Sequence, residues 1–174
     1  MAPPFQRVVV IGCSGAGKST FARRLSDVTG LPVTHIDQLF WEPGWVMAPQ
    51  PVYLARLEAV VSREAWIIEG VSTSTLDLRL PRTDAVIWLD RTRWACLGRV
   101  ARRIATSYGE VRPDMAEGCP EQIDFEFLRY IWRFHGNYDH RIHAAIEKHG
   151  LNRRTIMIRS DREAQDYLTS LALK

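Results

Sequence analysis

The chain has 174 residues, of which 46% are hydrophobic and 25% charged, and its formal net charge is +3. This length suits one compact domain with a sizeable core, and the composition is typical of a soluble globular protein. So small a net charge favours no particular class of partner.

Cysteine usage and hydropathy exclude several other classes. Cys13, Cys96 and Cys119 are odd in number and form no C-x-x-C pair, so a disulfide framework or a zinc site is not expected. No apolar run approaches the roughly 18 residues of a transmembrane helix, and the first residues lack the blocks of a secretory signal. We therefore expect a protein of the reducing cytoplasm with no membrane partner.

Short apolar runs alternate with helical patterns along the chain. The runs are rich in β-branched and aromatic residues, as buried parallel strands are, and they predict strands at 7–11, 33–37, 66–69, 85–90 and 155–159. The helical patterns predict helices at 18–29, 51–64, 92–106, 121–135, 139–149 and 162–171. This alternation predicts an α/β fold with a parallel sheet and helices on both faces.

Residues 39–51 and 107–120 interrupt this alternation, because both stretches are rich in proline and glycine and show no clear period. The sequence contains no repeat, linker or low-complexity segment. Residues 1–174 are therefore expected to form one domain.

The stretch "GCSGAGKST", residues 12–20, follows the first apolar run and matches the P-loop pattern G-x-x-x-x-G-K-[ST]. Its glycines allow backbone N–H groups to converge on phosphate oxygens, and the next helix adds its dipole. Lys18 is expected to reach the β- and γ-phosphates, and the Ser19 hydroxyl to bind Mg²⁺. The residues predicted to bind ATP here are Gly12, Ser14, Gly15, Ala16, Gly17, Lys18, Ser19 and Thr20.

Other P-loop classes lack support, because the chain has neither the N-K-x-D motif of GTPases nor the L-S-G-G-Q signature of ABC-type ATPases. A small kinase, or an NTPase of similar build, remains.

Asp37 closes the second predicted strand, at the carboxyl edge where ligands bind in open α/β sheets. A carboxylate there can orient an acceptor hydroxyl and take its proton. The alternative for Asp37 is a helix or turn cap, and His35, two residues earlier, is interpreted as a packing residue.

Five arginines crowd residues 91–103. Arg99 and Arg103 are spaced i,i+4, so they share a helix face and repel each other unless an anion lies between them. Guanidinium groups suit phosphate recognition, although a basic solvated helix is the structural alternative. A nucleic-acid groove is disfavoured, because no second basic stripe accompanies this one.

Further motifs extend over nearly the whole chain: "HID", "WEPGW", "WIIEG", "IWLD", "RVARR" and "IMIRSDREAQDYL". With the P-loop, they resemble the adenylate-kinase-related P-loop proteins that are labelled DNA topology modulation proteins. The chain is more loosely similar to shikimate, gluconate and nucleotide kinases. This resemblance implies a three-layer P-loop NTPase fold, with a five-stranded parallel sheet of order 2-3-1-4-5 and a mobile lid near 107–120.

The same resemblance implies roles for further residues. Glu69 would serve the Mg²⁺ shell, where the family usually has Asp, and Asp90 is the second candidate. In the related kinases one arginine lies against the adenine and triphosphate, and another lies on the transferring phosphoryl group. The resemblance assigns these two roles to Arg99 and Arg103. Arg112 would contribute a further guanidinium group from the lid. The aromatic group Phe40, Trp41 and Trp45 lies where these enzymes hold the acceptor, or packs the loop. Arg79 and Arg82 would hold an anionic acceptor or be surface charges.

The sequence thus predicts an ATP- and Mg²⁺-dependent phosphotransferase with Lys18, Asp37, Arg99 and Arg103 as catalytic residues and Ser19 and Glu69 as metal ligands. Its acceptor is a small molecule, with a nucleoside, a nucleotide and a sugar-like alcohol all open. AMP is disfavoured, because adenylate kinases carry an arginine directly after the third strand and "EGVSTST" has none. The alternative is an ATP-binding regulatory protein that switches a protein or DNA contact with little turnover.

Overall fold

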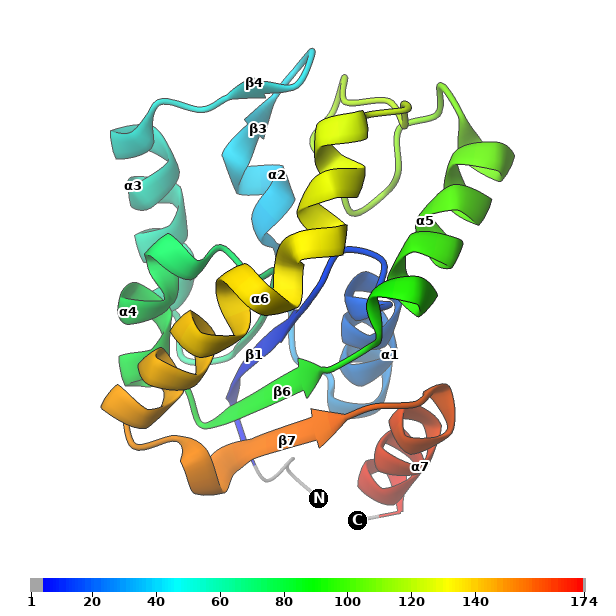
Figure 1. The fold of residues 1–174 in the computed structure, drawn as a ribbon. Helices are drawn as coiled ribbons and strands as arrows, with labels where there is room; N and C mark the ends of the chain where they lie inside the picture. Colours follow the sequence, from blue (N-terminus) through cyan, green and yellow to red (C-terminus); the bar gives the residue numbers. More distant parts are fainter. Residues whose placement is uncertain (1–4, 174) are drawn as a thin grey trace.

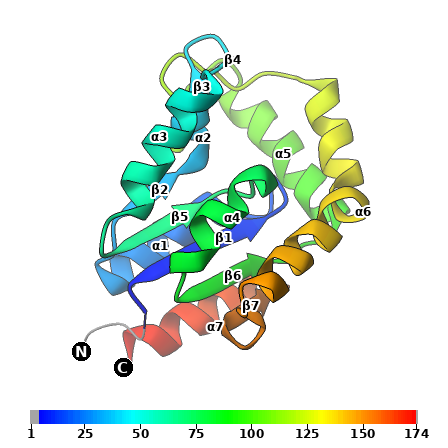
Figure 2. The same cartoon turned by 90° about the vertical axis from the view of Figure 1, so that its left-hand side faces the viewer.

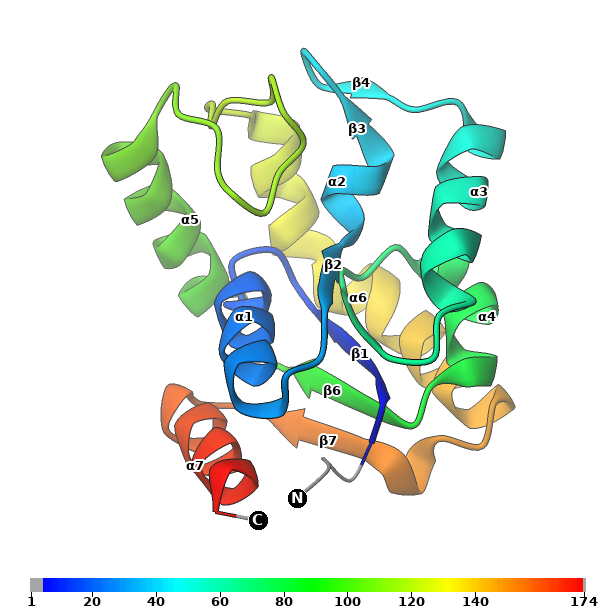
Figure 3. The ribbon, with the colours of Figure 1, turned by 180° about the vertical axis from the view of Figure 1, so that it is seen from behind.

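The computed structural model of the protein describes residues 5–173. A five-stranded parallel sheet forms its centre (Figure 1), and its strands are β1 (Arg7–Gly12), β2 (Val33–His35), β5 (Trp66–Glu69), β6 (Ala85–Leu89) and β7 (Thr155–Ile158). The helices are α1 (Lys18–Thr29), α2 (Ile36–Phe40), α3 (Gln50–Val61), α4 (Leu76–Arg79), α5 (Arg93–Ser107), α6 (Phe125–Lys148) and α7 (Asp161–Ala172). Helices α4 and α6 cover one face of the sheet, while α1 and α7 cover the other (Figures 1 and 3). The expected α/β architecture is confirmed.

The strand order is β2-β5-β1-β6-β7, with every pair parallel. This numbering differs from the expected 2-3-1-4-5, because two short strands were not predicted. β3 (Trp41–Glu42) and β4 (Val46–Met47) pair as an antiparallel hairpin outside the sheet and come between β2 and β5 in the chain. Gly44 and Trp45 both have positive φ, 79° and 62°, as the turn of such a tight hairpin requires.

Burial explains why the central strands read as continuous apolar runs. Val8, Val9, Val10 and Ile11 of β1 are fully buried, and all residues of β5 and β6 are buried too. A parallel sheet covered on both faces leaves no solvent-facing side on which polar residues could alternate. The registry of β1 with β5 places Val10 opposite Glu69, which brings the end of β5 beside the loop after β1.

The second strand is shorter than predicted. β2 ends at His35, and Asp37 lies in the first turn of α2 instead of closing the strand. Ile36 is buried against the chain beyond β5, where a Cβ atom on Gly70 would lie only 2.8 Å from the Ile36 Cβ atom. This close approach allows the chain to turn into a helix directly after His35.

The two helices predicted at 121–135 and 139–149 are one continuous helix, α6. Its buried residues Ile131, Phe134, Ile142 and Ile146 form one stripe that passes through Gly136 without a break. The prediction of two helices was wrong, because this buried stripe continues through Gly136 and Asn137, two residues of low helix propensity. None of the helices in residues 5–173 is long and apolar enough to cross a membrane.

Loops and short elements gather beyond the carboxyl ends of the strands. Residues 108–124 connect α5 to α6 and lie beside the β3–β4 hairpin (Figures 1 and 2). They contain the predicted lid, 107–120, except for its first residue, which ends α5. The Gly44 amide donates to the Gly118 carbonyl at 2.9 Å, and the Gln38 amide donates to the Pro113 carbonyl at 2.8 Å. These contacts cover the edge of the sheet where ligands bind in open α/β folds.

Candidate active site

The loop between β1 and α1 contains glycines at positions that disfavour a Cβ atom. Gly15 and Gly17 have φ of +83° and +92°, a region that residues with a Cβ atom rarely adopt. A Cβ atom at Gly15 would lie 2.4 Å from the Cys96 carbonyl oxygen, and one at Gly12 would lie 2.5 Å from that of Leu89. The loop therefore packs tightly against β6 and α5, which fixes its position at the end of the sheet.

The N-terminus of α1 has free backbone donors. The first intrahelical bond runs from the Phe21 amide to the Gly17 carbonyl at 3.0 Å, so the amides of Lys18, Ser19 and Thr20 have no partner within the helix. Gly17 is the N-cap residue and supplies no side-chain cap. Amides in this position, with the positive end of the helix dipole, form an anion-binding site.

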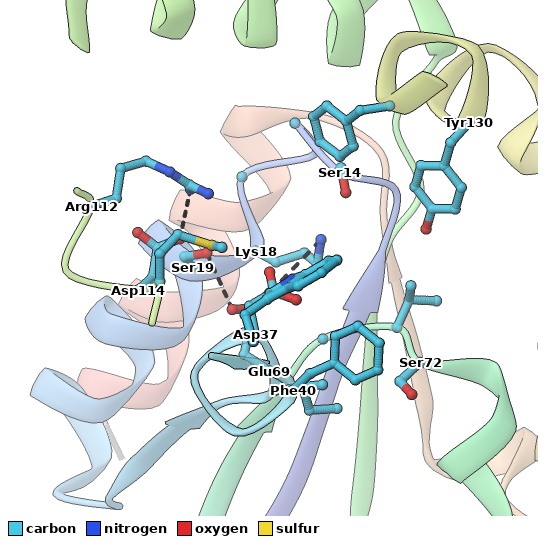
Figure 4. A pocket seen from close by; sticks show the side chains of 18 of the residues that line it. Ser14, Lys18, Ser19, Asp37, Phe40, Glu69, Ser72, Arg112, Asp114 and Tyr130 are labelled. Atoms are coloured by element: carbon cyan, nitrogen blue, oxygen red, sulfur yellow. Dashed lines mark hydrogen bonds and ion pairs between the residues drawn. The ribbon is translucent and has the colours of Figure 1, made fainter. Parts of the chain in front are cut away.

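A cavity of about 880 Å³ opens above this loop (Figure 4). Three sets of residues line it. The loop and α1 contribute Ser14, Gly15, Gly17, Lys18, Ser19, Thr20 and Arg23. Helix α5 and the connection to α6 contribute Arg99, Arg103, Arg112, Asp114, Met115, Gln122 and Asp124. The remaining wall contains Asp37, Phe40, Trp41, Trp45, Glu69, residues 70–74, Phe127, Tyr130 and Tyr138. The four residues predicted to be catalytic and the two predicted metal ligands all line this one cavity.

Glu69 is buried beneath the loop and contacts three of its neighbours. Ser19 Oγ donates to Glu69 Oε2 at 3.1 Å, His35 Nδ1 lies 2.7 Å from the same oxygen, and Lys18 Nζ lies 3.8 Å from Oε1. Burial raises the pKa of Glu69, but the hydrogen bond with His35 and the charge of Lys18 outweigh burial, so its pKa is lowered overall. Glu69 is therefore held as a carboxylate beside Ser19.

His35, interpreted from the sequence as a packing residue, thus positions and ionises Glu69. The pairing of β2 with β5, which puts His35 opposite Glu69, brings these side chains together. Alternation along the strand could reveal that His35 faces the site, but not which group it contacts.

Asp37 lines the cavity, and its side chain is exposed to that space. Reduced hydration between the cavity walls and the nearby charge of Glu69 raise the pKa of Asp37, while Lys18 and Arg112 oppose that rise. None of the main causes of this shift is a hydrogen bond. The Asp37 carboxylate is thus available to a ligand, which the alternative interpretation as a turn cap would not provide.

Asp114 enters the same region from the lid, and the sequence analysis missed it. Arg112 Nη1 lies 2.8 Å from Asp114 Oδ2. Burial raises the pKa of Asp114, but the charge of Arg112 outweighs burial and lowers that pKa overall. Asp114 and Arg112 lie on the same side of Lys18 in Figure 4. No local pattern marks Asp114, because it belongs to a loop without periodicity.

Each of the two predicted arginines on α5 has its own acidic partner. Arg99 Nη2 donates to Asp161 Oδ2 at 2.8 Å, and its Nη1 donates to the Ala16 carbonyl at 3.0 Å. Arg103 lies 2.9 Å from Glu121, which also pairs with Arg112 at 3.1 Å. These carboxylates relieve the repulsion expected between Arg99 and Arg103 and hold both guanidinium groups at the cavity.

Asp90, the second candidate for the Mg²⁺ shell, lies elsewhere. It follows β6 and accepts a hydrogen bond from Arg159 at 3.3 Å, and it is not among the residues that line the cavity.

Arg79 and Arg82 are neither acceptor ligands nor free surface charges. Arg79 is fully buried and donates to the carbonyl oxygens of Gly70 and Val71 at 2.9 and 3.1 Å, while Arg82 donates to that of Val61 at 2.7 Å. Burial lowers the pKa of Arg79 to about 10. The Arg79 side chain therefore shapes the loop after β5 from inside the protein.

Comparisons with known proteins agree with this geometry at the level of the fold. The chain is similar in structure to a shikimate kinase from Acinetobacter baumannii in complex with shikimate, with a TM-score of 0.60 and 16% sequence identity over 97% of this chain and 92% of that one. A gluconokinase from Sinorhizobium meliloti 1021 gives a TM-score of 0.54 and 18% identity over 99% and 96% of the two chains. A shikimate kinase from Bacteroides thetaiotaomicron gives 0.51 and 16% over 96% of each.

The protein therefore has the fold of P-loop kinases that act on small molecules. No family model and no curated protein sequence matches the chain. The resemblance to the DNA topology modulation proteins accordingly remains a prediction.

Proposed function

We propose that the protein is a kinase that transfers the terminal phosphoryl group of ATP to a hydroxyl group of a small acceptor. The observation that carries this proposal is the shared cavity of Lys18 and Asp37. A phosphate-binding loop and a carboxylate that accepts no side-chain hydrogen bond within residues 5–173 face the same space, as transfer between two bound molecules requires.

The phosphate groups would be held by the loop and Lys18. The Lys18 ammonium group donates to the Cys13 carbonyl at 3.1 Å, which holds it against the loop. The amides at the start of α1 supply further donors in a fixed arrangement, so no reorganisation is needed when charge moves during transfer.

The residues around Ser19 fit a magnesium ion that arrives with ATP. No group of three or more His, Cys, Asp or Glu residues able to hold a metal ion is found in residues 5–173. Mg²⁺ in such sites takes most of its ligands from phosphates and water and only one or two from the protein. Ser19 and Glu69, 3.1 Å apart, would supply those, and the bound ion would neutralise charge on the phosphate oxygens.

Arg99 and Arg103 would contact the triphosphate from α5, which lies beside the loop. Each guanidinium group has only part of its five donors engaged by its carboxylate partner, which leaves N–H groups for phosphate oxygens. Arginines that neutralise the transferring group contribute about 10³–10⁵-fold to the rate in some phosphoryl-transfer enzymes.

Asp37 would orient the acceptor hydroxyl and take its proton. A bond forms between the acceptor oxygen and the γ-phosphorus atom as the bond to the β–γ bridging oxygen breaks, and ADP leaves. The raised pKa of Asp37 makes its carboxylate a better proton acceptor than an ordinary aspartate.

The test is ADP release from Mg-ATP in the presence of nucleosides, nucleotides and small alcohols, with phosphorylated product identified by mass. Lys18→Met is expected to abolish acceptor-dependent turnover. Lys148→Met is the matched control, because Lys148 is exposed on α6 and pairs only with Asp77.

Stimulation by one acceptor, lost in Lys18→Met and kept in Lys148→Met, would support the kinase. Tight ATP binding with no acceptor-dependent turnover would reject it and favour the ATP-switched regulatory protein. A DNA-binding constant that falls steeply with salt, with a slope of several ions in a plot of log K against log salt concentration, would identify DNA as that protein's partner.

A further inference from the structure

The cations of the cavity are distributed unevenly. They are Lys18, Arg23, Arg99, Arg103 and Arg112, and they come from the P-loop and α1, from α5 and from the lid. The opposite part of the cavity lies between α2, the β3–β4 hairpin, residues 70–74 and residues 124–138, which cap and begin α6, and we name it the acceptor wall. None of its lining residues in 5–173 is a lysine or an arginine.

The two arginines nearest in sequence to the acceptor wall are both engaged elsewhere. Arg79 directs its guanidinium group into the interior, where the carbonyl oxygens of residues 70–72 and 75 accept its hydrogen bonds. Arg56 pairs with Glu42 at 2.8 Å and with the Leu39 carbonyl at 3.2 Å, and it does not line the cavity.

The charged groups on the acceptor wall are acidic. Asp37 lies at its base, and Asp124 lies at the start of α6. A carboxylate or phosphate group bound here would lose part of its hydration, would meet no lysine or arginine of the wall itself and would be repelled by Asp37. The wall therefore disfavours anionic acceptors such as shikimate, the carboxylate named with a structural relative.

Aromatic rings form the two sides of the acceptor wall. Phe40, Trp41 and Trp45 come from α2 and the hairpin, whereas Phe127, Tyr130 and Tyr138 come from α6. The rings contact neighbours on their own side, such as Phe40 with Trp41 at 4.9 Å and Tyr130 with Tyr138 at 5.4 Å between centroids. No ring contact joins the two sides in the described residues, and both sides line the same cavity.

Neutral hydroxyl groups complete the wall. Ser72 accepts a hydrogen bond from Tyr53 at 3.0 Å, which leaves its own hydrogen free to donate. Burial raises the pKa of Tyr130, so its phenol stays a neutral donor. In Figure 4, Phe40, Ser72 and Tyr130 lie on the other side of Lys18 from Arg112 and Asp114.

We infer that the acceptor is an uncharged alcohol that carries a flat ring, with a nucleoside as the representative compound. The ring would stack between the aromatic sides, neutral hydroxyl groups would bind its polar edge, and a hydroxyl group of the acceptor would point to Asp37. This inference rests on the proposed kinase function and adds the chemical class of its substrate.

The test measures two quantities for one panel of compounds: phosphoryl transfer from Mg-ATP and equilibrium binding by calorimetry in the presence of Mg-ADP. The panel contains the four ribonucleosides, ribose, gluconate, shikimate and the methyl ester of shikimate. We expect the best nucleoside to exceed ribose by at least about tenfold in kcat/KM, because ribose lacks the stacking ring. We expect the methyl ester to exceed shikimate, because the two compounds differ in charge.

Two variants sharpen the result. Ser74→Lys adds a cation to an exposed residue of the acceptor wall and should shift the ratio of shikimate to its methyl ester by about fivefold toward the anion. Phe40→Leu should weaken the binding of nucleosides more than the binding of ribose. Ser170→Lys and Phe125→Leu are the controls, since both positions are exposed and neither lines the cavity.

Each outcome separates this inference from the proposed function. Preferred transfer to shikimate or gluconate would overturn the inference and keep the proposed kinase function. Equal kcat/KM values for ribose and nucleosides would overturn the inference that a ring of the acceptor stacks between the aromatic sides. Nucleoside binding without transfer would keep the inference and reject the kinase. Absence of both binding and transfer for every compound would reject both.

Discussion

The phosphate side of the cavity and its acceptor wall are built in different ways. The phosphate side rests on nine consecutive residues, 12–20, that connect a buried strand to a helix, and its donors are mostly backbone amides. The acceptor wall collects side chains from four separate segments between residues 37 and 138. The phosphate side is fixed by a backbone geometry that few sequences allow. The acceptor wall can change through the substitution of one side chain at a time.

This difference explains why ATP is easier to assign than the acceptor. Glycines with positive φ and an uncapped helix N-terminus recognise phosphate whatever molecule carries it. The acceptor wall selects by ring, hydroxyl and charge, and so differs among proteins that share the fold. Changes on the phosphate side should therefore abolish function altogether, while changes on the acceptor wall should alter affinity or preference.

The largest effect is expected for Gly15→Ala. The new Cβ atom would lie 2.4 Å from the Cys96 carbonyl oxygen, in a backbone with φ of +83°. We expect a loss of at least about 2 kcal/mol in the free energy of unfolding, and loss of ATP binding. Chemical denaturation and nucleotide calorimetry measure both.

Gly98→Ala is the control for that change, because Gly98 lies within α5 and has no atom within 4 Å of the Cβ position. It should raise stability by up to about 1 kcal/mol, as alanine does in helices. Equal losses in the two variants would contradict the tight packing of the loop.

Asp37→Asn should separate chemistry from ATP binding. The amide keeps the size of the side chain but cannot take a proton, so kcat should fall by about 10²–10⁴-fold while the dissociation constant for ATP changes little. Asp166→Asn is the matched control, because the Asp166 side chain is exposed on α7. An unchanged kcat in Asp37→Asn would remove Asp37 from the mechanism.

The pH dependence should distinguish Asp37 from Glu69. Asp37 has a raised pKa, so the acidic limb of kcat/KM should lie above its ordinary value of 3.8 and disappear in Asp37→Asn. The contribution of Asp37 to stability is present below its unfolded pKa and is lost as the pH rises through the raised folded pKa.

Glu69 behaves in the opposite sense, because its pKa is lowered from 4.5. Its stabilising contribution is present above the unfolded pKa and is lost as the pH falls through the folded pKa. Unfolding curves of the protein and of Glu69→Gln from pH 3 to 7 measure this contribution, and curves that stay parallel throughout would show that Glu69 contributes nothing.

The smallest effect is expected for Tyr130→Phe, which removes one hydroxyl group from the acceptor wall. The acceptor KM should rise by about 3–10-fold, the value of one hydrogen bond, and the KM for ATP should not change. Tyr108→Phe is the control, because Tyr108 is exposed after α5 and does not line the cavity. A larger change in the KM for ATP than for the acceptor would contradict the division of the cavity.

Local sequence predicted the features that depend on neighbours in the chain. The apolar run 8–11 and the pattern after it define β1, the phosphate loop and the start of α1, because buried parallel strands and glycine turns have strong residue requirements. Residues 33–37 and the α6 region were predicted less well, because close packing at Gly70 ended β2 early and a buried stripe carried α6 through Gly136.

The sequence alone determined that this chain has a parallel β-sheet flanked by helices and a phosphate-binding loop, since both follow from residues adjacent in the chain. Only the tertiary structure decided that His35 holds Glu69, that Arg79 is buried away from the acceptor wall and that Asp114 enters the cavity that Ser19 lines. Ser19 and Asp114 are 95 positions apart in the sequence. The charge at such a site depends on which side chains the fold brings within hydrogen-bonding distance, and no local pattern records that.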